Sequence, residues 1–556
     1  IKLKSMSGKT AVFSVSGLKT LTDYTATVKG VSDIAGNTMD PAATYTFKTI
    51  SGDLKIKDNS GGNEYTAYCG FNDKIINLTP TFKGAPVSNV NYTSSDSGKV
   101  SVDSTGQVTI KTINLDSIDQ KVEIKAQIDD ETALYTVTIN SWYLVTKVNE
   151  FGQGGIINQN LNGRFRLAID EINFNGATIT PIGKNGSFPF TGVFDGDNKI
   201  LKNFSIQATA SYTGLFAYNT GTIQNLTIDS ASIETNACNY IGILCGYSKG
   251  KKEGSEYVEG IIRSCHVIKT TVNGKDYIGG IAGCSSGVIE DCSITESSVT
   301  AAACLNGKTG GIVGHNYGDV TLSKNIDTEV NGLQSVGGLI GYASKSTNEF
   351  TISGCSSNGE VTGTENVGGL IGLLANGNID DCHSTGNVVA DSANYVGGLV
   401  GYCKSGTVKN SYHTTGSVKG SQSVGGLIGQ DIGSDTKRNV IKDCYSSGDV
   451  RGETNVGGLI GDSRYSDIKV ESGNTYSSCN VFGDTSFGSA VGGLIGYCKG
   501  TKITGNSGNK IYTEGTVEGH TNVGGLIGQI YSWGTVTGCY HQDGIVQGTT
   551  FVGGLI

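Results

Sequence analysis

The sequence has little proline, tryptophan, methionine or charge. Of its 556 residues, 5 are Pro, 2 are Trp and 2 are Met, and 16% are charged. All five prolines precede residue 190. Because proline cannot donate to a strand ladder, its absence from the remaining chain favours continuous hydrogen-bonded strands. The apolar share of 37% is enough to bury a core and argues against disorder.

Positive charge is also scarce, with 41 Lys plus Arg against 50 Asp plus Glu. A nucleic-acid partner would need clustered positive charge, so we expect none. No run of 18 or more apolar residues occurs, and we expect no membrane insertion within these residues. The chain starts without Met or a signal-peptide pattern and stops inside a repeated motif, so we expect it to be a piece of a longer protein.

Glycine, in contrast, is abundant, and its distribution divides the chain. There are 84 glycines, about twice the usual share, and residues 1–141 hold only 11 of them. Residues 1–141 instead alternate apolar and polar residues with a period of two, which predicts short half-buried strands and hence a β-sandwich. The clearest such segments are Tyr24–Val28, Thr44–Thr49, Lys121–Ala126 and Leu134–Ile139, with turn clusters at Asp33–Asn37 and Asp103–Gly106.

Two stretches of this region resemble bacterial Ig-like domains. GVSDIAGN at Gly30–Asn37, followed by TYTFKT, resembles the C-terminal half of one type, and VNYTSSDSGKVSVDSTGQVTI at Val90–Ile110 is similar to a second type. The resemblance implies the end of one Ig-like domain over residues 1–50 and a second domain over residues 51–141. Such domains are extracellular spacers, so we expect no chemistry from them.

From about residue 213 a motif recurs whose clearest form is VGGLIG. Strong copies start at Val336, Val367, Val396, Val424, Val456, Val491 and Val523, and weaker ones at Thr213, Ile241, Ile278 and Thr309. In the earliest copy we align Thr213 with the first glycine of the later copies. The spacing between successive copies then averages about 31 residues. The pattern predicts roughly three short strands, separated by polar corners, in each repeat. Such strands bury their apolar face only when the coils formed by consecutive repeats stack on one another. We therefore predict an all-β chain in which Ig-like β-sandwich domains precede a parallel β-helix or β-solenoid.

These repeats closely resemble the GLUG motif family, which occurs in bacterial surface adhesins and beside peptidase domains that cut immunoglobulin. The resemblance covers most of residues 213–556, which we assign to the solenoid. Phe165–Ile206 looks like the lead-in of such proteins, so we assign residues 142–212 to a lead-in and N-terminal cap. The resemblance implies a secreted or cell-surface bacterial protein.

Fourteen cysteines are present, and half of them fall at a similar place in their repeats. Equivalent positions of a solenoid stack into a ladder, and buried free thiols, disulfides between coils and a zinc site are the three interpretations we consider. Zinc is the least favoured because no CxxC pair occurs. The proposed ladder contains Cys265, Cys292, Cys355, Cys382, Cys444, Cys479 and Cys539, with Ser411 substituting once.

Other polar candidates favour structural interpretations. Asp195 and Asp197 have the alternate spacing of calcium ligands but lack further ligands, so we interpret them as a polar turn. The adjacent pairs Asp129–Asp130 and Asp380–Asp381 are interpreted as solvated corners, and no HExxH metallopeptidase motif occurs. The histidines are His266, His315, His383, His413, His520 and His541, and glycosylation sequons lie at Asn77, Asn91, Asn203 and Asn225.

A row of tyrosines follows the glycine motif in several repeats, at Tyr218, Tyr247, Tyr342, Tyr402 and Tyr497. An exposed row would stack on sugar rings, whereas a half-buried row would pack on neighbouring coils. We predict no catalytic, cofactor-binding or metal site, and no cofactor. The expected function is a bacterial surface adhesin or display stalk that binds a host or environmental glycan or matrix protein. The alternatives are a self-associating subunit of a surface filament or layer, and a non-catalytic region of a surface peptidase or glycan-cleaving enzyme.

Overall fold

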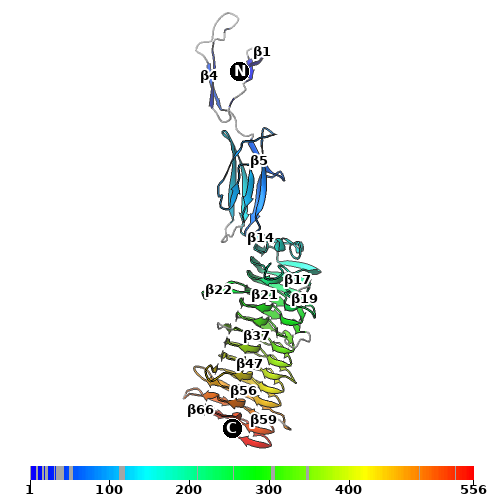
Figure 1. Cartoon of the computed structure of the whole chain (residues 1–556), viewed down its shortest axis with the longest axis vertical. Coiled ribbons are helices and arrows are strands. Elements are labelled where there is room, and N and C mark those ends of the chain that lie inside the picture. Colours follow the sequence, from blue (N-terminus) through cyan, green and yellow to red (C-terminus); the bar gives the residue numbers. More distant parts are fainter. Residues whose placement is uncertain are drawn as a thin grey trace. The chain divides into compact units, whose positions relative to one another are not determined.

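A computed structural model shows a chain made almost entirely of strands (Figure 1). It describes residues 54–111, 119–208, 211–254, 256–301, 307–345, 350–486, 489–506, 508–532 and 534–556, together with residues 2–7, 10–14, 18, 23–29, 32 and 43–48. The chain divides into two compact units, Ile1–Tyr143 and Leu144–Ile556. The finer division predicted from the sequence stays a prediction, and the expected turn at Asp33–Asn37 lies outside the described residues.

The first unit contains a two-layer β-sandwich. One sheet has the order β10-β11-β7-β5, with β8 paired to β7, and the other has the order β6-β13-β12-β9. Alternate residues of both sheets, among them Val108, Ile124 and Tyr135, form one buried cluster. This arrangement is compatible with an Ig-like domain. The strands are β5 (Leu54–Asp58), β6 (Glu64–Tyr68), β7 (Lys74–Phe82), β8 (Ala85–Pro86), β9 (Asn91–Ser94), β10 (Val100–Val102), β11 (Gln107–Ile110), β12 (Gln120–Ile128) and β13 (Glu131–Asn140).

Two antiparallel pairs precede the sandwich, β1 (Lys2–Ser7) with β2 (Thr10–Ser14) and β3 (Asp23–Val28) with β4 (Ala43–Lys48). The period-two alternation located the strands of this unit well, since all four segments singled out above overlap β3, β4, β12 or β13.

The second unit is a parallel β-solenoid, as predicted. Its coils contribute to a broad sheet and to two eleven-stranded sheets in which successive strands pair in parallel (Figure 1). In the coil that starts at residue 334, β36 (Gln334–Gly337) and β37 (Ile340–Ser344) belong to the two eleven-stranded sheets. The next three strands, β38 (Thr351–Ser353), β39 (Ser356–Ser357) and β40 (Val361–Thr362), belong to the broad sheet. Each coil thus turns its short strands around a common core.

The two eleven-stranded sheets are named here after their first strands. The β18 sheet contains β18 (Phe216–Asn219), β21 (Cys245–Ser248), β27 (Ala282–Ser285), β32 (Val313–Asn316), β37 (Ile340–Ser344), β42 (Ile371–Ala375), β47 (Val400–Lys404), β52 (Ile428–Ile432), β56 (Ile460–Arg464), β60 (Ile495–Lys499) and β65 (Ile527–Ile530). The β20 sheet contains β20 (Asn239–Gly242), β26 (Asp276–Gly279), β31 (Thr309–Gly310), β36 (Gln334–Gly337), β41 (Glu365–Gly368), β46 (Asn394–Gly397), β51 (Gln422–Gly425), β55 (Thr454–Gly457), β59 (Ser489–Gly492), β64 (Thr521–Gly524) and β69 (Thr550–Gly553).

The glycine pair of VGGLIG forms the turn between these two sheets. At Gly337 an added Cβ would overlap the carbonyl oxygen of Ile340, and at Gly338 it would overlap Ser357 and the carbonyl oxygen of Gly369 in the next coil. Only glycine therefore fits where successive coils approach this closely. Beside the turn, valines of successive coils such as Val336 and Val367 form a buried stack.

The earliest copy of the motif is displaced by one residue from the prediction. Thr213 pairs with Ile241, the residue before the first glycine of the next copy, so the first-glycine position is Gly214. Upstream, β15 (Arg164–Leu167), β16 (Glu171–Ile179) and β17 (Val193–Ile206) join the broad sheet in parallel and lead into β19 (Thr222–Glu234). A short helix, α1 (Ile156–Gln159), precedes them. None of the helices in the described part of the chain has the length and apolar character needed to cross a membrane.

Candidate functional site

Aromatic side chains lie along the outer face of the β18 and β20 sheets. The predicted tyrosine row occupies one register of the β18 sheet, with Tyr218 buried and the other four half-buried. Rings from the β20 sheet lie beside this row. We call the set the aromatic band, and its members are Tyr212, Tyr218, Tyr240, Tyr247, Tyr277, His315, Tyr342, Tyr395, Tyr402 and Tyr497.

Five rings of the band form one continuous stack. Tyr212 stacks on Tyr240, with ring centroids 5.1 Å apart, and Tyr240 stacks on Tyr277 at 4.5 Å. His315 follows at 5.6 Å from Tyr277, and Tyr342 lies 4.6 Å from His315. All these planes lie within 26° of parallel. These five rings are therefore packed between coils, and each of them except His315 belongs to a half-buried residue. The stack contains Tyr342 of the predicted row, and the burial of that row fits the interpretation that it packs on neighbouring coils.

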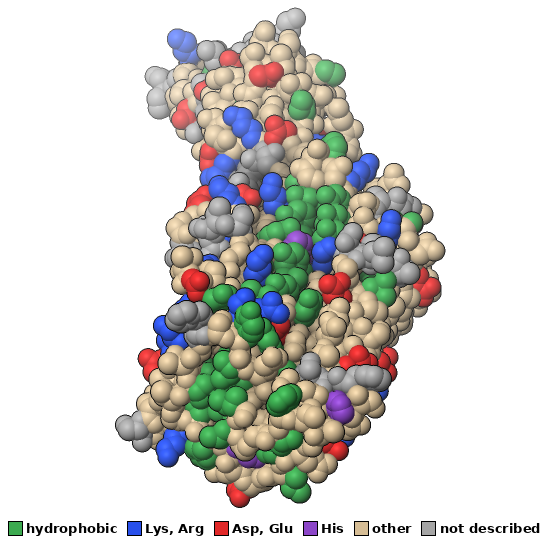
Figure 2. Space-filling view, turned by 60° about the horizontal axis from the view of Figure 1, so that its bottom comes forward, with side chains coloured by type: hydrophobic (Ala, Val, Ile, Leu, Met, Phe, Trp, Pro, Cys, Tyr) green, Lys and Arg blue, Asp and Glu red, His purple; other side chains and the backbone are tan. Residues whose placement is uncertain are grey.

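Two members of the band, Tyr277 and His315, are held in their neutral forms at pH 7. Burial raises the pKa of Tyr277 to about 12, and burial together with Lys308 lowers the pKa of His315 to about 3. Cations lie against the rings, with the Lys308 ammonium 4.8 Å from the centroid of Tyr277 and the Arg464 guanidinium 5.6 Å from that of Tyr497. Figure 2 shows hydrophobic side chains gathered in a band along one face of the solenoid, with Lys and Arg side chains beside it.

Three tyrosines of the band hold an unfavourable backbone conformation. Tyr240, Tyr277 and Tyr395 have φ of 55°, 55° and 61°. Bulky residues rarely adopt this left-handed region, and doing so costs about 1–3 kcal/mol. In five other coils a Ser or Asn takes the same conformation at the equivalent position, namely Ser335, Asn366, Ser423, Asn455 and Asn522, and Ala490 and Phe551 take it in two more. Sequence reasoning missed these three tyrosines, which precede the motif that it examined.

A second ring stack runs along the outside of the broad sheet. It consists of six residues whose neighbouring centroids lie 4.7–5.5 Å apart with planes within 16° of parallel, namely His383, Tyr412, Tyr445, Tyr476, Tyr512 and Tyr540. Each ring covers the face of the next, so the stack exposes ring edges rather than faces. We call this set the edge stack.

The cysteine ladder exists, with one correction. Tyr445 pairs with Tyr476 and Gly448 pairs with Cys479, so Cys479 lies outside the ladder and Thr475 takes the place after Cys444. The error arose because Cys479 stands four residues further along its strand than the repeat spacing suggests. In register, the ladder runs through Cys265, Cys292, Ser323, Cys355, Cys382, Ser411, Cys444, Thr475, Ile511 and Cys539.

The described cysteines are all free thiols, and every one except Cys539 is buried. Burial raises the pKa of Cys444 to about 12 and that of Cys539 to about 11. Such thiols are protonated and poorly reactive at neutral pH. Within the described residues, no group of three His, Cys, Asp or Glu side chains is arranged to hold a metal ion.

Asp195 is an internal structural carboxylate. Arg166 Nη2 donates to it at 3.0 Å, Asn225 Nδ2 at 3.0 Å and the backbone N–H of Asp197 at 2.9 Å. Burial opposes ionisation, but these donors outweigh it, and the pKa of Asp195 is lowered. Asp197 pairs with Lys199 at 2.8 Å. The two carboxylates are thus engaged by this chain, in line with the polar-turn interpretation.

The other carboxylate candidates also lie at corners. Asp380 forms an ion pair with Lys409 at 3.0 Å, and Asp381 and Asp129 take the left-handed turn conformation, with φ of 52° and 48°. His413 is fully buried, where its Nε2 lies 3.1 Å from the carbonyl oxygen of Gly416, and burial lowers its pKa to about 4. These groups stabilise the fold rather than line a common cleft.

The comparisons with known proteins agree with the repeat architecture. Residues 363–389 match the family model of the GLUG motif. The match covers one coil, from the turn before β41 through β42, β43 (Asn378–Asp380) and β44 (His383–Ser384) to β45 (Val388–Val389). The second unit is thus a parallel β-solenoid of repeats, and the repeat at residues 363–389 carries the GLUG motif.

The chain is also similar to halomucin of Haloquadratum walsbyi (strain DSM 16790 / HBSQ001). The two are 36% identical over 121 residues, which is 21% of this chain and 1% of halomucin. This chain therefore matches a very small part of that protein's length. Together, the motif and this similarity fit a repeat protein of the cell surface.

Proposed function

We propose that this chain is part of a bacterial surface protein that acts as an extracellular adhesin or display stalk. In this proposal the aromatic band is the binding face, and a glycan or matrix protein outside the cell is the partner. The parallel solenoid supplies a stiff support, since each coil is hydrogen-bonded to its neighbours along the whole stack. We also propose that this part of the protein is not catalytic.

The strained tyrosines are the observation that carries this proposal. At the position of Tyr277, asparagine or serine would adopt the left-handed conformation at lower cost, as Asn366 and Ser335 do. Backbone strain of this kind persists where function requires the residue. Each strained tyrosine also joins the band through a ring contact, Tyr240 and Tyr277 with each other and Tyr395 with Tyr402.

Replacing the strained tyrosines separates binding from stability. The double variant Tyr240→Asn, Tyr277→Asn relieves backbone strain while it loses ring stacking of about 0.5–1.5 kcal/mol per pair, so its unfolding temperature should change little. The 556-residue chain and the variant are titrated against immobilised host glycans and matrix proteins. We expect saturable binding by the native chain and at least tenfold weaker binding by the variant.

The matched control is Tyr445→Asn, Tyr476→Asn, which removes two rings from the edge stack and leaves the aromatic band intact. We expect this control to bind as the native chain does. Binding that both double variants lose equally would contradict the proposal. Absence of binding by the native chain, with ordered polymers detected by light scattering in the same samples, would favour the filament alternative instead.

A further inference from the structure

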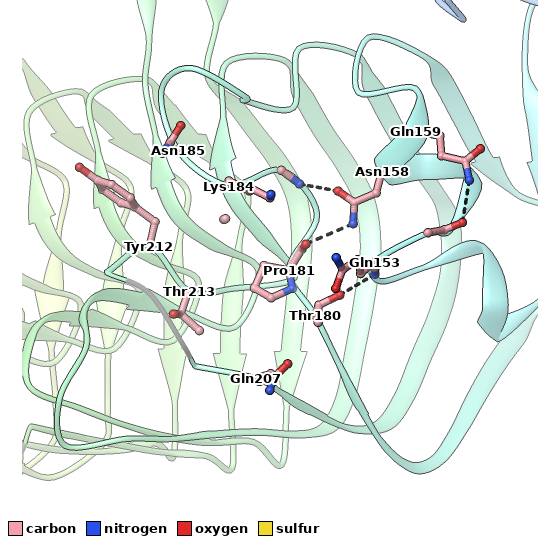
Figure 3. Close-up of a pocket in the computed structure, with 13 residues that line it drawn as sticks. Gln153, Asn158, Gln159, Thr180, Pro181, Lys184, Asn185, Gln207, Tyr212 and Thr213 are labelled. Carbon is pink, nitrogen blue, oxygen red and sulfur yellow. Dashed lines mark hydrogen bonds between the residues drawn. The ribbon is translucent and has the colours of Figure 1, made fainter.

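A pocket of about 570 Å³ opens in the second unit, at the end of the aromatic band (Figure 3). This volume lies within the range of small-molecule sites. In Figure 3, Tyr212 and Gln159 lie on opposite sides of the pocket, with Asn158, Pro181 and Lys184 between them. The lining residues come from the α1 region, the loop after β16, the end of β17 and the start of β18.

The pocket wall is held by hydrogen bonds of two side chains, Asn158 and Thr180. Asn158 Nδ2 donates to the carbonyl oxygens of Gly152, at 2.8 Å, and Pro181, at 3.2 Å. Its Oδ1 accepts from the backbone N–H of Gly183 at 2.9 Å. Thr180 Oγ1 accepts from the backbone N–H of Gln153 at 2.5 Å. These bonds join the two loops on either side of the cavity, so the pocket is formed before any ligand binds.

Polar groups without a partner face this opening. Within the described part of the chain, the side chains of Gln153, Lys184 and Gln207 have no hydrogen-bond or ionic partner. Each glutamine amide offers two donor hydrogens and an acceptor oxygen, and the lysine offers three donors. Among the described residues, the lining contains no Asp or Glu, so these residues provide neither a carboxylate pair for glycoside hydrolysis nor carboxylate ligands for a hard cation.

One face of the Tyr212 ring is left uncovered by the rings of the described residues. Its centroid lies 5.1 Å from that of Tyr240 and 6.3 Å from that of Tyr247, with near-parallel planes. Tyr240 and Tyr247 are themselves 6.5 Å apart, far less than rings on opposite faces would be, so both lie on the same side of Tyr212. Tyr218 contacts it at an interplanar angle of 81°. Tyr212 therefore ends the five-ring stack, and among the described residues no ring stacks on its other face.

We propose that this pocket binds one or more sugars of a carbohydrate chain. The C–H groups on one face of a pyranose carry partial positive charge and pack on the electron-rich face of Tyr212. The hydroxyl groups of the sugar act as donors and acceptors at once, which matches the amides of Gln153 and Gln207. The inference deepens the adhesin proposal and rests on it, because it identifies where and how an external glycan is bound.

The test measures binding of soluble sugars to the whole chain. The probes are defined hexasaccharides of glucose, mannose, galactose, N-acetylglucosamine and glucuronate, titrated by calorimetry. We expect saturable binding of at least one probe. The double variant Gln207→Ala, Tyr212→Ala should weaken it at least tenfold with an unchanged circular dichroism spectrum, whereas Gln334→Ala, an amide on the β20 sheet distant in sequence from the pocket, should bind normally.

The outcomes separate the pocket from the adhesin proposal. Binding of a hexasaccharide that the Gln207→Ala, Tyr212→Ala variant retains would overturn the pocket assignment and leave the adhesin proposal standing. Binding of the native chain to matrix proteins but to none of the hexasaccharides would also overturn the pocket alone. Failure of the native chain to bind any sugar or any matrix protein would overturn both.

Discussion

The hydroxyl of Ser446 donates a hydrogen bond to the carbonyl oxygen of Gly458 across the interior of the solenoid, at 2.6 Å. Gly458 is the second glycine of its motif, and the same bond recurs from Asn325 to Gly338 and from Thr513 to Gly525. In these coils a buried polar side chain on the broad sheet thus donates a hydrogen bond to the glycine carbonyl oxygen in the turn that links the two eleven-stranded sheets.

Removing this hydroxyl should weaken the coil. In Ser446→Ala the Gly458 carbonyl oxygen loses this hydrogen bond and retains the weaker one from the Cys479 thiol, whose sulfur lies 3.3 Å away. Because a buried acceptor is then poorly satisfied, we expect a loss of about 1–3 kcal/mol in the free energy of unfolding. Ser447→Ala is the control, because Ser447 is the next residue in β54 (Tyr445–Arg451) and is only partly buried. Urea unfolding followed by circular dichroism compares the two. Equal stability of both variants would contradict the role of Ser446.

The second glycine of the motif should not tolerate a methyl group inside the stack. In Gly338→Ala the new Cβ would overlap Ser357 and the backbone of the following coil, so we expect poor folding or a loss of several kcal/mol. Gly554→Ala is the matched control, since the same motif position there has no atom within 4 Å of the added Cβ. Thermal unfolding midpoints check the contrast, and similar midpoints for both variants would refute it.

Asp431 should make stability depend on pH. It is fully buried beside Asn439 and Ser466, and burial raises its pKa to about 6. Between about pH 4 and 6 the folded chain keeps a proton that the unfolded chain has released. The stability contributed by the neutral acid is therefore complete below about pH 4 and is lost as the pH rises through 6.

Comparison with Asp431→Asn isolates this contribution. The variant stays neutral, so from pH 4 to pH 7 its free energy of unfolding should gain up to about 3 kcal/mol relative to the native chain. His413 and His315 have lowered pKa values and change stability in the opposite direction, but they are common to both proteins. Asp435→Asn, at an exposed site, should show no such gain. A constant difference between native chain and Asp431→Asn at every pH would disprove the assignment.

The state of the cysteines can be read by alkylation. Because the described thiols other than Cys539 are buried, iodoacetamide on the native chain should label Cys539 alone among them, and slowly. Unfolding in guanidinium should make all of them reactive. Peptide mass spectrometry gives the labelling at each site, and Cys304, which lies outside the described residues, is counted separately. Linked peptides that join Cys265 to Cys292, or Cys355 to Cys382, with a mass lower by two hydrogen atoms, would show disulfides between coils instead.

Local pattern was sufficient to predict the architecture of this chain. Period-two alternation placed strands such as β12 and β13, and the glycine motif with its following Val strand predicted stacked parallel coils. Both patterns can be recognised in a single sequence because the burial of each residue depends on its own position in its strand or coil. The tyrosine row was located for the same reason, although whether it is exposed could not be decided.

The tertiary structure decided whatever depends on alignment between coils. Loops of unequal length vary the spacing between equivalent residues, and Cys479 therefore lies outside the ladder that its spacing suggested. The pairing of Thr213 with Ile241 places the first glycine of the earliest copy at Gly214. Tyr277 and Ser446 lie outside the motif itself, and only the register of the coils brings Tyr277 to the band and Ser446 to the turn. Repetition in the sequence predicts the coil. Ring stacks form between residues of different coils, and internal hydrogen bonds such as that from Ser446 to Gly458 join different sheets, so no local pattern encodes them or the pocket beside Tyr212.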